Sequence, residues 1–214
     1  MTHMMNMNSV QALILTILLI AGSLCQAAQN DMPADGKHHD VRILIDVSGS
    51  MKENDPQNLR RSALRLITEL LPAGSKAGVW TFGAYVNMLV PYGTVDKLWK
   101  QQAEKSTNDI NSFGLSTDIE KTLRVSSWDW NKTEPGYQRD YILLTDGLVD
   151  ISSDAQENRS SRFRILNEIL PRIQQSGGTI YTIALSEKAD SDLLQQLASA
   201  SSGWHETVKS ADEL

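Results

Sequence analysis

Hydrophobic residues along the chain fall into short runs that alternate with longer amphipathic segments. The runs are rich in β-branched residues, which is typical of buried strands. Two of them, VRILIDV at 41–47 and YILLT at 141–145, are nearly continuous in apolar residues, as strands covered on both faces are. The predicted strands are Val41–Val47, Ala77–Phe82, Tyr85–Val90, Tyr141–Thr145, Thr179–Leu185 and His205–Val208.

The segments between the runs place apolar residues at helical spacing. The first begins with Asp55 and Pro56, a pair typical of a helix start, and ends before Pro72. Its apolar face is predicted to consist of Leu59, Ala63, Leu66, Ile67 and Leu70. Pro171 is expected to kink or delay the fourth of these helices. Beyond the first, helices are predicted over Val95–Glu104, Thr117–Ser126, Arg162–Gln175 and Asp190–Ala200.

The order of the elements, a strand and then a helix, repeated, predicts a doubly wound α/β fold. Such a fold has a mostly parallel sheet with helices on both faces. The runs at 77–82 and 85–90 are separated only by Gly83-Ala84, so they predict a hairpin and one antiparallel edge strand. The two most apolar runs, 41–47 and 141–145, are expected to be parallel interior strands.

The first 39 residues lack this alternation. Val10–Leu24 is an apolar run that is short for a membrane span but typical of a secretory signal, and Cys25-Gln26-Ala27 fits its cleavage site. We therefore expect a signal peptide over residues 1–27 and a mature protein exported to the periplasm or cell envelope. The polar residues 28–39 are expected to be a linker that includes His38 and His39.

A membrane tether is the alternative to a cleaved signal. The first eleven residues contain no Lys or Arg, which departs from the usual signal and leaves open an uncleaved N-terminal anchor. The end of the chain, Ser210–Leu214, has the pattern of a helix start without the amphipathic helix that should follow. We therefore expect the last helix of the domain to be truncated, and a region beyond Leu214 could also hold a tether.

Composition narrows the classes of partner. The 214 residues are 41% hydrophobic, which suits one globular domain over residues 40–214. The 26 acidic residues exceed the 20 basic ones, and no dense Lys/Arg block is present, which argues against nucleic acid as a partner. Cys25 is the only cysteine and lies within the predicted signal, so the mature protein is expected to lack disulfides and thiolate chemistry.

Acidic and hydroxyl side chains follow the two most apolar strands. Asp46, Ser48 and Ser50 form Asp-x-Ser-x-Ser at the end of one strand, and Asp146 follows the other. Because the carboxyl ends of parallel strands meet at one edge of a sheet, both carboxylates are expected on one rim. Their repulsion is relieved by a cation, and such oxygen ligands favour Mg²⁺, Mn²⁺ or Ca²⁺.

Together with Thr117 in GLSTDIEKTL, these motifs resemble the von Willebrand factor A-type domain and its metal-ion-dependent adhesion site, over about Asp40 to Leu214. The resemblance implies that Ser48, Ser50 and Thr117 contact the ion through their hydroxyls. It also implies that Asp46 and Asp146 bind the ion directly or through water, and that one position stays open for an acidic group of a partner protein.

One part of the pattern departs from the family. Many members have two glycines before the threonine, whereas this chain has Gly114-Leu115-Ser116. Ser116 is therefore an alternative to Thr117 as the ligand. We prefer Thr117 because TDIEKTL continues the helix pattern of the family.

Two functions use the same cluster. The first is a metal-dependent protein-interaction module that holds an acidic residue of its partner, and the second is a metal-assisted hydrolase. No His lies near the cluster in sequence, no Gly-x-Ser-x-Gly surrounds Ser48 or Ser50, and no P-loop occurs, so we expect no enzyme. A metal-free scaffold is the third alternative, and the five intact ligand types argue against it.

Two other segments have two interpretations each. Ser126–Arg139, with Trp128, Trp130 and Tyr137, forms either an aromatic contact surface or a cover for an apolar edge of the sheet. Asp150–Ser161 is expected to be a polar loop. It either contacts the partner molecule that binds at the metal or is simply solvated.

Overall fold

The computed structural model of the protein describes residues 38–130, 136–146, 149–186 and 189–208. The predicted signal peptide, most of the predicted linker and the last six residues lie outside these ranges, so their predicted roles stay predictions. Within the described ranges, no helix has the length and apolar character that a membrane span needs.

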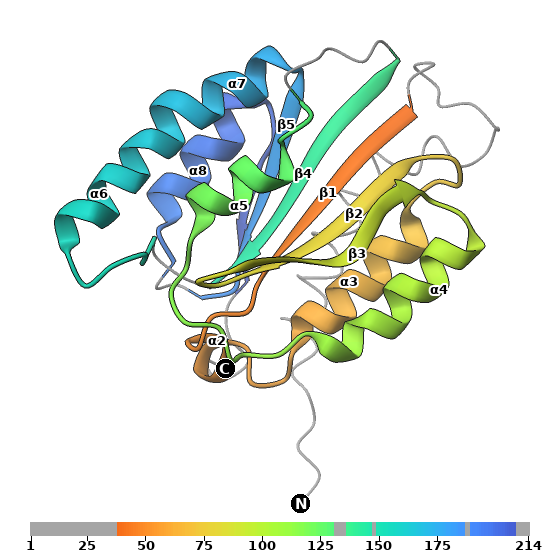
Figure 1. Ribbon diagram of the computed structural model, residues 1–214, viewed down its shortest axis with the longest axis horizontal. Helices are drawn as coiled ribbons and strands as arrows, with labels where there is room; N and C mark the ends of the chain where they lie inside the picture. The colour runs from red at the N-terminus through yellow and green to blue at the C-terminus, as the bar shows by residue number, and fades with distance from the viewer. Residues whose placement is uncertain (1–37, 131–135, 147–148, 187–188, 209–214) are drawn as a thin grey trace, which may run out of the picture.

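Six strands form a single sheet in the order β3-β2-β1-β4-β5-β6 (Figure 1). Only the β2–β3 pair is antiparallel, which confirms the predicted hairpin and edge strand. β1 and β4 are parallel neighbours inside the sheet, as the two most apolar runs predicted. The strands are β1 (His38–Asp46), β2 (Lys76–Phe82), β3 (Val86–Thr94), β4 (Tyr137–Thr145), β5 (Gly178–Ala184) and β6 (His205–Thr207).

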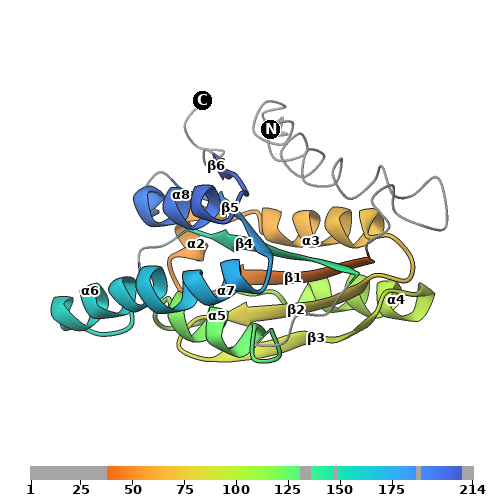
Figure 2. The ribbon, with the colours of Figure 1, turned by 90° about the horizontal axis from the view of Figure 1, so that it is seen from above.

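Helices lie on both faces of the sheet, so the predicted doubly wound α/β fold is confirmed (Figure 2). α3 and α4 pack on one face, and α5, α7 and α8 pack on the other. The α-helices are α2 (Met51–Asn54), α3 (Leu59–Leu70), α4 (Lys97–Ser106), α5 (Ile119–Ser126), α6 (Ala155–Arg164), α7 (Leu170–Gln175) and α8 (Ser191–Ala200). A short 3₁₀ turn over Thr107–Asp109 follows α4.

β1 divides the core into two layers. Val41, Ile43 and Ile45 point to the α3–α4 side, and Leu44 points to the α5–α7 side, because successive side chains of a strand alternate between faces. All four are fully buried. This burial on both faces explains why the run is nearly continuous in apolar residues.

Several predicted boundaries are wrong. β3 ends at Thr94 rather than at Val90, and β4 begins at Tyr137 rather than at Tyr141. β1 begins at His38, so His38 and His39 belong to the strand rather than to the linker, and His39 contacts Asp140 of β4 (Nδ1–Oδ2 3.2 Å). α3 begins at Leu59 rather than at Pro56, because α2 already uses Met51–Asn54 and the chain must turn before the next helix.

The helix start is nevertheless stabilised by the predicted residue. Asp55 accepts a hydrogen bond from the backbone N–H of Leu59 (2.6 Å) and of Arg60 (3.3 Å), so it satisfies free donors of α3 from outside the helix. The buried face of α3 carries Arg60, Ala63, Leu64, Ile67 and Thr68, and it is therefore rotated from the predicted one.

The prediction of a polar loop over Asp150–Ser161 is also wrong in part, because the segment is helical from Ala155. α6 begins at Ala155, and α6 and α7 form one helical stretch joined by a π-helical segment over Ile165–Ile169. Pro171 follows this segment in the first turn of α7. Proline lacks an N–H and clashes with the preceding turn, and a wider π turn is one of the known ways to accommodate it.

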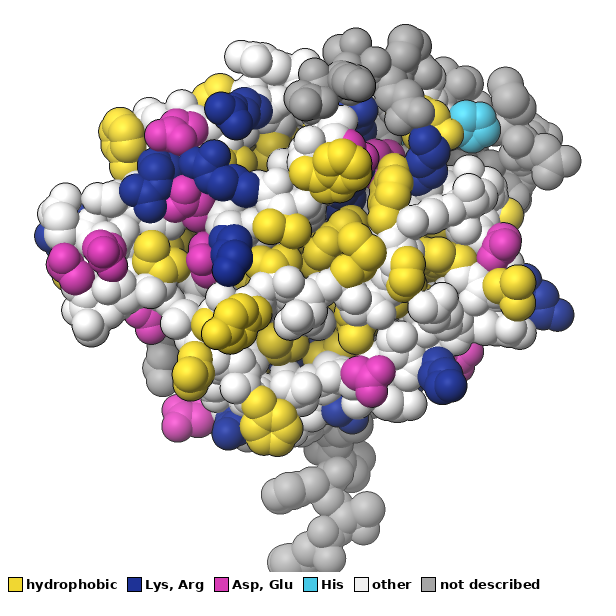
Figure 3. Space-filling model, in the orientation of Figure 1, with side chains coloured by type: hydrophobic (Ala, Val, Ile, Leu, Met, Phe, Trp, Pro, Cys, Tyr) yellow, Lys and Arg dark blue, Asp and Glu magenta, His cyan; other side chains and the backbone are white. Residues whose placement is uncertain are grey.

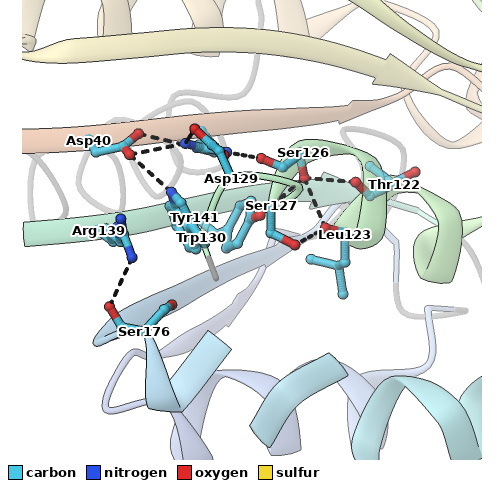
Figure 4. Close-up of polar contacts among 11 residues, drawn as sticks. Asp40, Thr122, Leu123, Ser126, Ser127, Asp129, Trp130, Arg139, Tyr141 and Ser176 are labelled. Carbon is cyan, nitrogen blue, oxygen red and sulfur yellow. Dashed lines mark hydrogen bonds and ion pairs between the residues drawn. The ribbon is translucent and has the colours of Figure 1, made fainter. Parts of the chain in front are cut away.

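A buried arginine of β1 holds the loop that follows α5. Arg42 is 1% exposed and donates to both carboxylate oxygens of Asp40 and of Asp129 at 2.6–3.2 Å, and also to the Ser126 carbonyl. Its guanidinium carbon lies 4.5 Å from the ring centroid of Trp130. Figure 4 shows the two aspartates, Ser126 and Trp130 converging on this cluster. Burial acts to lower the pKa of Arg42, but the hydrogen bonds to its aspartates prevail and raise that pKa.

The cluster decides between the two interpretations of the tryptophans. Trp130 is 4% exposed and donates its indole N–H to Asp40 (3.0 Å), so it covers the sheet. Trp128 is 73% exposed, whereas Tyr137 is half-buried at the start of β4. Of these three aromatic residues, Trp128 is therefore the one that exposes most of its side chain to solvent.

Candidate metal centre

Asp46 ends β1 with its side chain fully buried. One carboxylate oxygen accepts the backbone N–H of Ser48 (2.8 Å), and the other accepts the hydroxyl of Thr145 (2.6 Å). Thr145 ends β4, the neighbouring parallel strand, and follows Leu144, which pairs with Ile45 of β1. The orientation of the carboxylate is therefore fixed from its own turn and from the next strand.

Ser48, Ser50 and Asp146 continue from Asp46 as one hydrogen-bonded network. The hydroxyls of Ser48 and Ser50 are 3.1 Å apart, and Ser50 donates to Asp146 (3.1 Å). Asn54 of α2 donates its amide to the second oxygen of Asp146 (3.0 Å). Asp46, Ser48 and Asp146 are at most 3% exposed, whereas Ser50 faces solvent. Four of the five predicted ligands thus meet at the carboxyl ends of β1 and β4, beside α2 (Figure 1).

Thr117 lies on the next loop. Its backbone N–H donates to the Asp150 carbonyl (2.7 Å), and its carbonyl accepts from the Asp150 N–H (3.2 Å). On the same loop, Gly114 donates to the Val47 carbonyl (2.8 Å) and pairs with Ser48. In the described part of the chain, Thr117 itself is hydrogen-bonded to Asp150, and its loop is connected to the Ser48 turn through Gly114.

Glycine at position 114 lets the two loops approach. A Cβ added at Gly114 would lie 2.7 Å from the Val47 carbonyl oxygen, closer than real Cβ atoms come to backbone atoms. A larger residue would push the Thr117 loop away from Ser48 and Ser50. Ser116, two residues after Gly114, departs from the family pattern of two glycines before the threonine. Its backbone is left-handed (φ 63°), a conformation that favours glycine.

An experiment can decide whether the hydroxyl of Thr117 or that of Ser116 is the metal ligand. Thr117 is 4% exposed, whereas Ser116 serves the turn before it. We expect Thr117→Ala to weaken Mn²⁺ binding about 10–100-fold, as loss of a group that holds the metal does. Ser116→Ala should change the affinity by less than about threefold, because it keeps the turn and removes no ligand. Calorimetric titration checks this, and a larger loss in Ser116→Ala would exchange the two roles.

The electrostatics of the site favour a cation. Burial, together with repulsion by the Asp146 carboxylate, raises the pKa of Asp46 to about 6, against the opposing hydrogen bonds from Ser48 and Thr145. In the described ranges, no three side chains of the His, Cys, Asp and Glu types are grouped to hold a metal. The donors are two carboxylates and hydroxyls, so they fit a hard divalent cation whose positive charge they only partly offset.

The raised pKa predicts a pH dependence of metal binding. A proton on Asp46 competes with the cation, and the proton is lost as the pH rises through about 6. The apparent Mn²⁺ affinity should be constant well above this pH and should fall about tenfold per pH unit below it. Titrations at a series of pH values check this, and an affinity unchanged across that range would contradict it.

Three neighbours of the site were not predicted from the sequence. Besides Thr145 and Asn54, Arg60 of α3 is fully buried and donates to the backbone carbonyls of Asp46 (2.7 Å) and Asn111 (3.2 Å) and to the Asp55 carboxylate (2.7 Å). It thereby ties the Asp46 turn to the loop that leads to Thr117. The signal in the sequence was an arginine within a predicted amphipathic helix. The role of Arg60 could not be predicted from it, because that role depends on tertiary contacts.

A mostly parallel sheet with helices on both faces defines a doubly wound α/β domain, and a cluster of carboxylates and hydroxyls lies at the carboxyl ends of its strands. The sequence profile of the von Willebrand factor type A domain matches residues 40–214. The chain therefore belongs to this family. A curated relative, a von Willebrand factor A domain-containing protein of Dictyostelium discoideum, is 26% identical over 172 residues. That match covers 78% of this chain but only 17% of the relative's length.

Three solved structures share the fold. A von Willebrand factor type A protein from Catenulispora acidiphila gives a TM-score of 0.65 at 17% identity, covering 82% of this chain and 39% of that one. Proximal thread matrix protein 1 of the mussel byssus, with a zinc-occupied MIDAS motif, gives 0.62 at 19%, covering 83% and 45%. Manganese-loaded TRAP protein of Plasmodium vivax gives 0.57 at 17%, covering 77% and 63%.

Proposed function

We propose that the protein is an exported, metal-dependent protein-interaction module without enzymatic activity. A divalent cation held by Asp46, Ser48, Ser50, Thr117 and Asp146 binds an acidic group of a partner protein. The observation that carries this proposal is the network in which two buried carboxylates and two hydroxyls meet on one rim. The raised pKa of Asp46 supports it, because the rim lacks the positive charge that its carboxylates need.

The chemistry of the donors supports Mg²⁺ or Mn²⁺, with Ca²⁺ as a further candidate. Two structural relatives carry zinc or manganese, and for the mussel protein the ion is in its MIDAS motif. Serine and threonine hydroxyls are neutral, so the ion keeps much of its charge. A carboxylate from outside is the natural group to complete the coordination, and solvent exposure of Ser50 leaves that side open.

The described contacts of the cluster support binding rather than hydrolysis. Apart from the two carboxylates proposed as metal ligands, the described hydrogen-bond partners of the cluster are Thr145, Asn54 and backbone groups, none of which is a general base. Export to the periplasm or cell envelope is supported by the apolar run at Val10–Leu24.

A pull-down from cell-envelope extract tests the function. We expect the immobilised full chain to retain a partner in the presence of Mn²⁺ and to release it on addition of EDTA. Asp146→Asn, which removes a proposed ligand and keeps the side-chain shape, should retain nothing that EDTA releases. Retention of the same proteins by wild type and by Asp146→Asn, with or without EDTA, would contradict the proposal.

A further inference from the structure

Three apolar side chains stand exposed beside the metal centre. Tyr85 is 75% exposed, and Phe113 and Leu115 are each 77% exposed, which makes them the most exposed large hydrophobic residues in the described part of the chain. They line one groove of about 320 Å³ together with Val47 and Gly114. We call this feature the rim groove. Exposed apolar surface of this kind often marks an interaction site.

The rim groove is continuous with the metal centre through the backbone. Gly114 lies between Phe113 and Leu115 and pairs directly with Ser48. Gly83, two residues before Tyr85, packs against Gly114, since a Cβ added there would lie 3.1 Å from the Gly114 Cα. The floor of the groove therefore includes backbone, and its apolar walls begin at the edge of the Ser48 loop. Polar residues complete the lining, namely Thr81, Asn87, Asp109 and Asn111.

Lysines accompany both aromatic rings of the groove. Nζ of Lys52 lies 5.1 Å from the ring centroid of Phe113, and Nζ of Lys121 lies 5.7 Å from that of Tyr85. Both lysines are exposed. Such contacts combine a cation with the face of a ring. Figure 3 shows hydrophobic side chains next to Lys or Arg along the lower edge of this view, the edge where α2 lies in Figure 1. These positive charges complement an acidic partner.

We propose that the rim groove receives a large apolar side chain that lies close in sequence to the acidic residue of the partner. This inference rests on the proposed function, because the carboxylate on the metal brings the partner to the rim. Gly114 and Ser48 are bridge partners, and neighbouring strands are about 5 Å apart. An extended segment advances about 3.3 Å per residue, so the apolar residue lies within about three positions of the acidic one.

The metal and the groove select for different features of the partner. The ion selects the carboxylate but does not distinguish one acidic residue from another. The groove distinguishes them, because only an acidic residue with a large aliphatic or aromatic neighbour fills both sites. Tyr85, Phe113 and Leu115 are therefore specificity-determining residues of this chain.

A random peptide library displayed on phage tests the inference. The library is applied to the immobilised full chain in Mn²⁺ buffer and eluted with EDTA. We expect the eluted peptides to share Asp or Glu, with Phe, Leu, Ile, Tyr or Trp enriched within three positions of it. A shared acid without apolar enrichment would overturn the inference and leave the proposed function standing. Peptides without a shared acid would overturn both.

Variants then locate the effect. For a selected peptide, the double substitution Phe113→Ser and Leu115→Ser should weaken binding about tenfold or more, with Mn²⁺ affinity unchanged. Leu98→Ser is the matched control, because Leu98 is 73% exposed but lies away from the metal centre. It is at the start of α4, which follows the end of β3, and that end pairs with the beginning of β2 rather than with its carboxyl end. Equal peptide affinity in the double variant and in the control would overturn the inference.

Discussion

Asp46→Asn is expected to make the metal-free protein more stable and at the same time to abolish Mn²⁺ binding. In the unfolded chain the Asp46 carboxyl has its usual pKa of 3.8, whereas in the folded protein the pKa is about 6. Between these pH values the folded state holds a proton that the unfolded state has lost, so stability falls as the pH rises. Above pH 6 the loss from this group is about 3 kcal/mol.

The asparagine removes this loss without removing the local hydrogen bonds. Its oxygen can accept from the Ser48 N–H, and its amide can donate to the Thr145 hydroxyl. Urea unfolding in EDTA above pH 6 should therefore show a gain of about 2–3 kcal/mol, which should vanish near pH 4. A destabilised variant at high pH, or Mn²⁺ affinity equal to wild type, would contradict the assignment of Asp46.

The second large effect is expected at Arg42. Arg42→Met would leave the Asp40 carboxylate 1% exposed without its cation, and removal of one partner from a buried ion pair typically costs about 3–5 kcal/mol. The Trp130 indole would still donate to Asp40, but neutral donors do not replace a charge. Urea unfolding in EDTA measures the loss.

Mn²⁺ affinity separates this effect from an effect on the site. Arg42 precedes Asp46 by four positions on β1, a distance of about 13 Å along a strand, so Arg42→Met should leave Mn²⁺ affinity within about twofold. Asp129→Asn is the control, because Asp129 is the 30% exposed partner and its loss should cost much less. Equal losses in the two variants would show that Asp40 is not the critical partner.

The fold could be predicted because its signals are local. The β1 and β4 runs are apolar on both faces, as interior parallel strands are. The apolar pattern therefore predicted both the burial of these strands and their place inside the sheet. The start of α3 could not be predicted in the same way. Asp55 does cap that helix, but from four residues ahead of Leu59, since α2 occupies the preceding segment.

In the candidate site, too, the residues that follow strand ends could be predicted, whereas those that act through tertiary contacts could not. Asp46, Ser48, Ser50 and Asp146 follow strand ends, and the topology of a parallel sheet brings strand ends together. Arg60 and Thr145 act on Asp46 through contacts that depend on helix rotation and strand register. Neither quantity is encoded in a short motif, so these residues became visible only in the folded chain.

Titration of the EDTA-treated full chain with Mn²⁺ by calorimetry, at a pH well above 6, tests the central claim most directly. The account predicts saturable binding of one ion per chain, and it predicts that Mg²⁺ competes for the same site. The absence of saturable binding in the wild type, or binding in Asp46→Asn and Asp146→Asn that is as tight as in the wild type, would show that these carboxylates do not form a metal centre.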